Sequence, residues 1–307
     1  MNRQEWSRGF QVLALVALAF GLWSCAAVSA RALEANAAEA SSVQDPQPPA
    51  EAKPDNPAKP KLPKVEWSPV MSPDAVKKAT DRGANFLIDN RRPDGGYGTY
   101  IDDVGITALV VQALATCPRA YREDDGPFIS KAIEYLLGKQ KENGGFYNAG
   151  QGLENYKTSV TLLALTALDE GRDPPRYTKS IEEAREYLMT LQSSEDNGYD
   201  SEKHKKAYGG IGYGSDRRPD LSNTQFAIEA LRAAGISEDS DVFKRALGFL
   251  KRCQNAEGND LFGEESGAKS TGDGGMMYSP GSTKAETVEN PDGTVSYTSY
   301  GSMTYAG

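Results

Sequence analysis

A short segment recurs four times in this chain, and its fixed internal spacing constrains the fold more than any other feature. Each copy has a small residue, an aromatic residue three positions later and a Gln position five positions after that, followed by a glycine and another aromatic residue. The copies begin at Arg82, Lys131, Glu183 and Arg245. A fixed spacing that returns at a long period indicates a repeat architecture built from one supersecondary unit.

A second, apolar segment lies between the copies. Its members align without gaps, at residues 107–114, 161–168 and 224–231, and residues 302–307 look like the start of a fourth. These segments are apolar nearly all round, which is typical of buried helices, whereas the first segment mixes charges with apolar residues at helical spacing and predicts a surface helix. The alternation predicts an all-α fold with an outer layer of amphipathic helices around an inner layer of apolar ones. Ser72 and Pro73 predict the start of the first outer helix.

The first segment resembles the QW repeat of triterpene cyclases, which belong to the prenyltransferase/squalene-cyclase repeat group. The resemblance covers residues 74–307 and implies an α/α toroid of helix pairs, here incomplete with about four units and truncated at its C-terminus. In that group the Gln closes the end of an outer helix and stacks on the ring of the turn. The matching positions are Gln140, Gln192 and Gln254, with the rings Tyr97, Phe146, Tyr199 and Phe262. The chain departs from the pattern because no ring is Trp and Arg91 replaces the first Gln.

The chain divides into three parts. Residues 1–32 combine early arginines, an apolar run and small residues, which predicts a bacterial-style signal peptide. Residues 33–72 are rich in Pro and Ala and predict a disordered linker, which leaves 73–307 as the repeat domain. We favour cleavage and a secreted or periplasmic protein. The alternative is a lipoprotein anchored through Cys25, whose lipidation would be the membrane tether.

The net charge limits the kinds of binding partner, and the cysteine content limits the possible disulfides. The formal net charge is -9, so nucleic acid is excluded as a partner, because phosphate contacts need a cationic surface. Beyond Cys25 the cysteines are Cys117 and Cys253. An exported protein permits a disulfide between them, but two separate apolar thiols are the favoured interpretation.

Candidate ligand residues gather in the turns, next to the starts of the expected inner helices. Toroids of this group take ligands at that end, where helix N-termini favour carboxylates and anions. Asp102 and Asp103 are the candidate catalytic acids, although helix capping is the plainer interpretation of this pair. The predicted ligand mouth contains Tyr97, Tyr100, Tyr213, Asp216 and Asp273. Such a set suits alkene protonation, cation–π stabilisation of a carbocation, sugar stacking or calcium binding.

Three motifs of related toroids are missing from the sequence. Squalene cyclases use an Asp-x-Asp-Asp acid, and neither the stretch at Asp102 nor the one at Glu123–Asp125 matches it. Prenyltransferases bind zinc through Asp, Cys and a later His, but the single histidine, His204, precedes Cys253. The Gly-Cys-Gly-Glu-Gln thioester motif is also absent. We therefore expect no metal and no cofactor.

These observations favour an exported, non-catalytic toroid that binds a lipid, an isoprenoid, a glycan or a partner protein. Two alternatives stay open: a terpene cyclase-like enzyme acting on a polyprene, and a polysaccharide lyase-like toroid enzyme. The insertion at residues 260–299 is a lid or a disordered loop, because long loops are usually one or the other. Within it, residues 272–278 are expected to return to the mouth, and residues 290–297 predict a hairpin-like turn.

Overall fold

The computed structural model describes residues 72–98, 103–214, 218–262 and 267–307. The predicted signal peptide and nearly all of the predicted linker lie outside these ranges, as do Tyr100, Asp102 and Asp216. The helices alternate between outer and inner along the chain. The outer helices are α3 (Pro73–Asp89), α5 (Pro127–Leu137), α7 (Thr178–Thr190) and α9 (Asp241–Cys253). The inner helices are α4 (Asp103–Thr116), α6 (Glu154–Asp169), α8 (Leu221–Ala233) and α10 (Gly301–Ala306).

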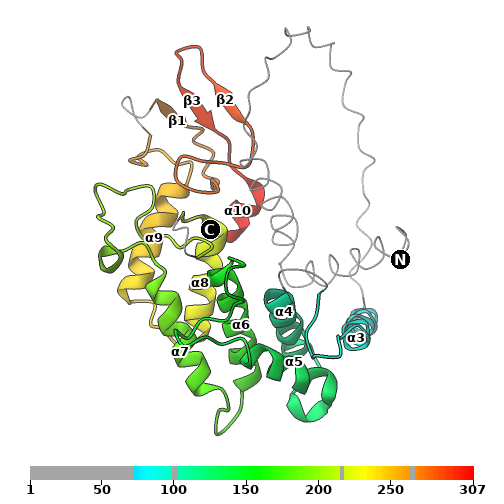
Figure 1. Cartoon of the computed structure of the whole chain (residues 1–307). Helices are drawn as coiled ribbons and strands as arrows, with labels where there is room; N and C mark the ends of the chain where they lie inside the picture. The colour runs from blue at the N-terminus through cyan, green and yellow to red at the C-terminus, as the bar shows by residue number, and fades with distance from the viewer. Residues whose placement is uncertain (1–71, 99–102, 215–217, 263–266) are drawn as a thin grey trace, which may run out of the picture. The chain divides into compact units, whose positions relative to one another are not determined.

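The two kinds of helix differ in burial as the sequence predicts. Helix α6 lies between α4 and α8, and α10 lies against α8 (Figure 1). Helix α6 buries every residue from Asn155 to Leu162, whereas the outer helix α7 buries only Ala184, Tyr187 and Leu188. The prediction of buried inner helices and amphipathic outer helices is therefore confirmed, and the fold is that of α/α toroid helix pairs.

The start of α3 and the state of the two cysteines agree with the predictions from the sequence. The hydroxyl of Ser72 accepts the amide of Ala75 at 3.2 Å, which confirms the predicted start of α3. Cys117 and Cys253 are both free and buried, which confirms the prediction of separate thiols. Within the described ranges, no helix is both long and apolar enough to cross a bilayer.

Each turn between an outer and an inner helix has the same backbone structure. The residue after the Gln position donates its amide to the second glycine of a Gly-Gly pair, and the first glycine donates back to it. The donor pairs are Arg92 to Gly96, Lys141 to Gly145, Ser193 to Gly210 and Asn255 to Gly275, at 2.8–2.9 Å. The first glycines have φ between +72° and +97°, a region that disfavours every other residue.

In the first three turns the first glycine also lets the next outer helix approach. A Cβ atom at Gly95, Gly144 or Gly209 would lie 2.1–2.2 Å from a carbonyl oxygen of that helix. The three carbonyls belong to Lys131, Glu183 and Arg245, which are the residues that begin the sequence repeats. The glycine therefore explains two fixed positions of the repeat at once.

The repeat aromatics and glutamines join neighbouring units. Tyr187 lies over Gly145, and Phe249 lies over Gly210, where a Cβ atom would meet the ring at 2.6–2.7 Å. Gln192 Nε2 donates to its own turn at Gly209 O and to Val242 O of α9, both at 2.9 Å. Gln140 likewise reaches Ser180 O of α7 at 3.1 Å. The Gln thus ties its helix to the next outer helix, in addition to bonding its own turn.

The structure corrects the alignment of the turns and inner helices. In every unit a threonine hydroxyl accepts the amide that follows the Gly-Gly pair, at 2.9–3.0 Å, and the threonines of the first three units are buried. These pairs are Tyr97–Thr107, Phe146–Thr158, Ile211–Thr224 and Met276–Thr304. The third and fourth positions are held by Ile211 and Met276, not by the predicted Tyr199 and Phe262. In the second inner helix the equivalent residue is Thr158, one turn before the predicted Thr161.

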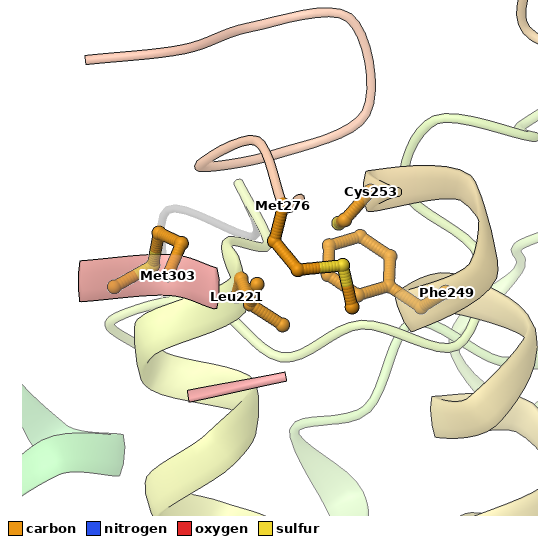
Figure 2. Close-up of a cluster of buried hydrophobic side chains, with 5 residues drawn as sticks. All are labelled: Leu221, Phe249, Cys253, Met276 and Met303. Atoms are coloured by element: carbon orange, nitrogen blue, oxygen red, sulfur yellow. The ribbon is translucent and has the colours of Figure 1, made fainter. Parts of the chain in front are cut away.

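The insertion of the fourth unit is structured in its described part. Strands β1 (Ala268–Ser270), β2 (Thr287–Glu289) and β3 (Val295–Tyr297) form a small sheet in the order β1-β3-β2. The amide of Asn290 donates to Thr294 O at 2.8 Å between β2 and β3, which confirms the predicted hairpin. Between β1 and β2 in the sequence, Met276 packs with side chains from α8, α9 and α10, namely Leu221, Phe249, Cys253 and Met303 (Figure 2).

We predict that Gly144→Ala destabilises the protein far more than Gly150→Ala. Both glycines have a positive φ, +88° and +76°, but only a Cβ at Gly144 meets a backbone oxygen, at 2.2 Å, whereas none of the described atoms lies within 4 Å of a Cβ at Gly150. We expect a cost of about 1–2 kcal/mol for the control and roughly 3 kcal/mol or more for Gly144→Ala, measured by urea unfolding. Equal costs would contradict the close approach of α7.

We also predict that Thr158→Val costs more stability than Thr161→Val. The first change leaves the buried amide of Phe146 without its acceptor, which costs about 1–3 kcal/mol. The second removes only a side-chain bond to the carbonyl of Lys157 within α6, so we expect less than about 1 kcal/mol. Thermal and urea unfolding of the pair test the corrected register; the reverse order would favour the sequence alignment.

Candidate functional site

Of the predicted acid pair, the structure describes Asp103, which begins α4. Both oxygens of its carboxylate have partners. Its Oδ2 accepts a short hydrogen bond from the Tyr135 hydroxyl and lies 3.4 Å from Arg92 Nη2. Its Oδ1 accepts Asn148 Nδ2 at 2.9 Å. The partners come from the first turn, from α5 and from the second turn, so the carboxylate joins three segments of the chain.

These contacts determine the charge of Asp103. Burial acts to raise its pKa, but hydrogen bonds from Tyr135, Asn148 and Arg92 outweigh burial and hold the pKa below the usual value for aspartate. Burial, and then the bond to Asp103, raises the pKa of Tyr135 to about 12. Asp103 is therefore an ionised acceptor near neutral pH, and it has no proton to donate.

Arg92 holds this arrangement from the first turn. Its guanidinium pairs with Asp94 at 3.0 Å and donates to the carbonyl of Gly98 at 2.9 Å. Its Cζ atom also lies 5.5 Å from the centre of the Tyr135 ring. The guanidinium of Arg92 thus binds groups of its own turn and the carboxylate of Asp103.

The corrected register places Asp103 in a series. Counting back four residues from the repeated threonine gives Asp103, Glu154, Asp220 and Tyr300. Asp220 is 4% exposed and caps α8, because its two oxygens accept the backbone amide and the side-chain Nδ2 of Asn223, both at 2.8 Å. Burial, and then the charge of Asp220, raises the pKa of Tyr278. In the first and third units, the acid at the start of the inner helix therefore lies next to a tyrosine.

The same register identifies a stretch that the sequence search missed. Asp220-Leu221-Ser222-Asn223 has the spacing of the Asp-x-Asp-Asp acid of squalene cyclases but keeps only its first aspartate. Ser222 and Asn223 are both buried. The position of this stretch directly before Thr224, the threonine of its unit, is the signal that marks it in the sequence.

The other predicted mouth residues divide between two roles. The hydroxyl of Tyr213 is 3.5 Å from that of Tyr278, and the carbonyl of Tyr278 accepts the amide of Leu221 at the start of α8 at 2.8 Å. Tyr97 is only 3% exposed and belongs to the core. Asp273 accepts the amide of Gly275 at 2.9 Å and the Ser299 hydroxyl at 2.5 Å, which stabilises the fourth turn as Asp94 does the first. Tyr100, Asp102 and Asp216 lie outside the described residues.

The acidic run before α5 has a structural role at the opposite end of the units. The Asp125 carboxylate accepts the amide of Arg122 at 2.7 Å within the short 3-10 helix η1 (Glu123–Asp125). Glu123 is buried and binds Arg172 and the Tyr177 hydroxyl through short contacts, with Arg176 at 3.7 Å. This network ties two inter-unit loops together. In the ranges that the structure covers, no three His, Cys, Asp or Glu side chains cluster as metal ligands.

The family model described as the squalene-hopene cyclase C-terminal domain matches residues 100–278, from the first turn to Tyr278. The chain belongs to this family. A drimenyl diphosphate synthase from Streptomyces showdoensis is 24% identical over 199 residues, which are 63% of this chain and 34% of that protein.

Two further relatives match part of this chain. A squalene–hopene cyclase from Zymomonas mobilis is 27% identical over 197 residues, 63% of this chain and 28% of the cyclase. Thioester-containing protein 1 allele R1 from Anopheles gambiae is 25% identical over 139 residues, 41% of this chain and 10% of that protein. The chain spans about a third of the length of the synthase and less of the other two relatives.

We predict that Asp103→Asn lowers stability by about 1–3 kcal/mol at pH 7, because three donors lose a charged acceptor. The folded-state pKa of Asp103 is lowered, so its stabilisation is present above the unfolded pKa of about 3.9 and is lost as pH falls through the folded value. The difference in the free energy of unfolding between wild type and variant should therefore become smaller below pH 4. Urea unfolding at pH 7 and at pH 3 measures it. Asp124→Asn, at an exposed position in η1, is the matched control; a gap that is equal at both pH values would contradict the assignment.

Proposed function

We propose that this protein is a non-catalytic binding member of the squalene-hopene cyclase C-terminal domain family. The observation that carries the proposal is the start of α8, where Asp220 is followed in the sequence by Ser222 and Asn223 and by no second carboxylate of an Asp-x-Asp-Asp acid. The remaining acid, Asp220, is buried and caps the helix.

The chemistry of alkene protonation supports this proposal. A general acid needs a carboxylic acid that keeps its proton at the working pH, which requires a raised pKa. The pKa of Asp103 is shifted the other way, and a serine hydroxyl or an asparagine amide is far too weak an acid to replace a carboxylic acid. We therefore assign the carboxylates of the inner-helix starts to structure.

The ligand we propose is an isoprenoid or another lipid held at the mouth, with a glycan as the alternative that the test must separate. Tyr213 and Tyr278 meet at the start of α8, and Lys284 Nζ lies 4.9 Å from the centre of the Tyr278 ring. Aromatic rings provide apolar contact area, and their hydroxyls orient a ligand with one polar end.

A terpene cyclase-like activity is the second candidate, and the family membership favours it. Relatives named squalene–hopene cyclase and drimenyl diphosphate synthase match about two thirds of this chain. Under this alternative Asp220 and Asp103 act on a polyprene. The polysaccharide lyase-like alternative has no specific observation in its favour.

Export is part of the proposal and is supported by the first 32 residues alone. Their basic start, apolar run and small residues fit a signal peptide, and the Pro-rich stretch that follows fits a spacer. We propose a secreted or periplasmic protein, with anchoring through Cys25 as the alternative processing outcome. Mass spectrometry of the mature N-terminus distinguishes a cleaved chain from one that starts at a lipidated Cys25.

We predict that the purified protein converts neither squalene nor farnesyl diphosphate to a cyclic product, as measured by gas chromatography with mass detection. We expect saturable quenching of tyrosine fluorescence by a detergent-dispersed isoprenoid, weakened about tenfold in Tyr278→Ala, whose ring contact area is lost. Tyr305→Ala, at a position that is 98% exposed, is the control. Cyclic product that disappears in Asp220→Asn would overturn the proposal, and binding of polygalacturonate in place of the isoprenoid would favour the glycan ligand.

A further inference from the structure

A cavity of about 720 Å³ lies among α6, α7 and the C-terminal end of α8, three helices that pack on one another (Figure 1). All of its lining residues lie between Gln112 and Gly235 in the sequence. The candidate ligand residues described above gather at the N-terminal starts of the inner helices, whereas this cavity is bordered by the C-terminal ends of α6 and α8, at Asp169 and Ala233. The cavity is therefore a separate place from the mouth.

Arg185 of α7 lines this cavity and carries a buried donor that has no acceptor. Its Nε atom is shielded from solvent, and none of the described residues accepts a hydrogen bond from it. A guanidinium keeps its charge at any ordinary pH, so Arg185 cannot lower the cost of burial by losing a proton. A buried donor without a hydrogen bond destabilises a protein, and native structures rarely contain one. A ligand in the cavity that offers an acceptor accounts for this donor.

The acidic side chains that line the cavity leave Arg185 available to such a ligand. Both oxygens of Asp169 are occupied, because they accept the backbone amides of Arg176 at 2.9 Å and Tyr177 at 2.8 Å. Glu170 and Glu182 also line the cavity, but both are exposed and neither forms an ion pair with Arg185. Because these carboxylates repel a multiply charged anion such as phosphate more strongly, the charges favour a ligand with a single negative charge.

Apolar side chains give the cavity a second kind of surface. Leu163 and Ala167 of α6 and Ile181 of α7 line it together with Arg185. Thr178, the first residue of α7, also lines it, and the helix rises about 10 Å from there to Arg185. The cavity thus extends over about two helical turns from a single guanidinium. A volume of this size, with apolar walls and few polar groups, is typical of sites for small organic ligands.

We propose that this cavity binds an amphipathic carboxylate, a ligand with one carboxylate group and an apolar chain, as in a fatty acid. The Nε atom of Arg185 donates to the carboxylate, which is the acceptor that a guanidinium matches best in geometry and charge. The apolar chain lies along Leu163, Ala167 and Ile181, where it removes apolar surface from water. This site is independent of the ligand proposed for the mouth, so either proposal can fail without the other.

Isothermal titration calorimetry of the purified protein with dodecanoate, kept below its micellar concentration, tests this proposal. We expect saturable binding with a dissociation constant about tenfold higher in Arg185→Gln, because a hydrogen bond between two charged groups is lost. Lys179→Gln, which removes an exposed cation of the same helix, is the matched control and should keep the wild-type affinity. Dodecylammonium, which has the same chain and the opposite charge, should bind at least tenfold more weakly than dodecanoate.

A second variant gives an independent measurement. Ala167→Phe fills part of the cavity and leaves Arg185 in place, so it should also weaken dodecanoate binding about tenfold. Tyr278→Ala separates the cavity from the mouth, since weaker dodecanoate binding in that variant would place the ligand at the mouth and overturn the proposal. Equal affinities of Arg185→Gln and wild type, tighter binding of dodecylammonium, or no saturable binding of dodecanoate would overturn it as well; the last result would leave water as the partner of Arg185.

Discussion

The rest of the structure depends on how closely an outer helix approaches the glycine turn of the preceding unit. At three turns the first glycine leaves no room for a Cβ atom, because a helix carbonyl occupies that space at 2.1–2.2 Å. The same glycine needs a positive φ to reverse the chain. Two demands on one residue explain why the Gly-Gly pair recurs while the surrounding turn varies in length. Through this contact the Gln and the aromatic ring reach the next helix, so the turn sets the spacing of the whole stack.

The chemistry at the inner-helix starts follows from the same architecture. In the first and third units the start places a carboxylate four residues before the buried threonine, close to the tyrosine of a neighbouring segment. A carboxylate there meets helix amides and tyrosine hydroxyls, which favour its ionised form. An acid that must keep its proton needs a different environment, with further carboxylates to raise its pKa. In this chain Ser222 and Asn223 follow Asp220 at the start of α8, and Asp220 caps the helix by accepting from Asn223.

Particular residues show how far the sequence alone could reach. The spacing of Gln140 and Gln192 predicted the outer helices, the turns and their order correctly, because these positions are set by contacts that recur in every unit. The ring of the third turn was assigned to Tyr199, whereas the structure places Ile211 there. The insertion between Gly198 and Gly209 moved the true glycine pair away from its expected distance. The inner helix of the second unit was displaced by one turn for a similar reason, since Thr158 and Thr161 both fit an apolar helix.

The sequence by itself determined the all-α class, the alternation of buried and amphipathic helices and the family, because these depend on periodicity and on motif spacing, which are properties of the chain alone. Only the tertiary structure decided which residues of different units meet. Asp103 became an ionised acceptor because Arg92, Tyr135 and Asn148 converge on it from three segments. The register that relates Asp220 to Asp103 also came from contacts, namely the threonine hydroxyls that accept the turn amides. A hydrogen bond between distant segments leaves no periodic mark in the sequence, and for that reason it could only be found in the fold.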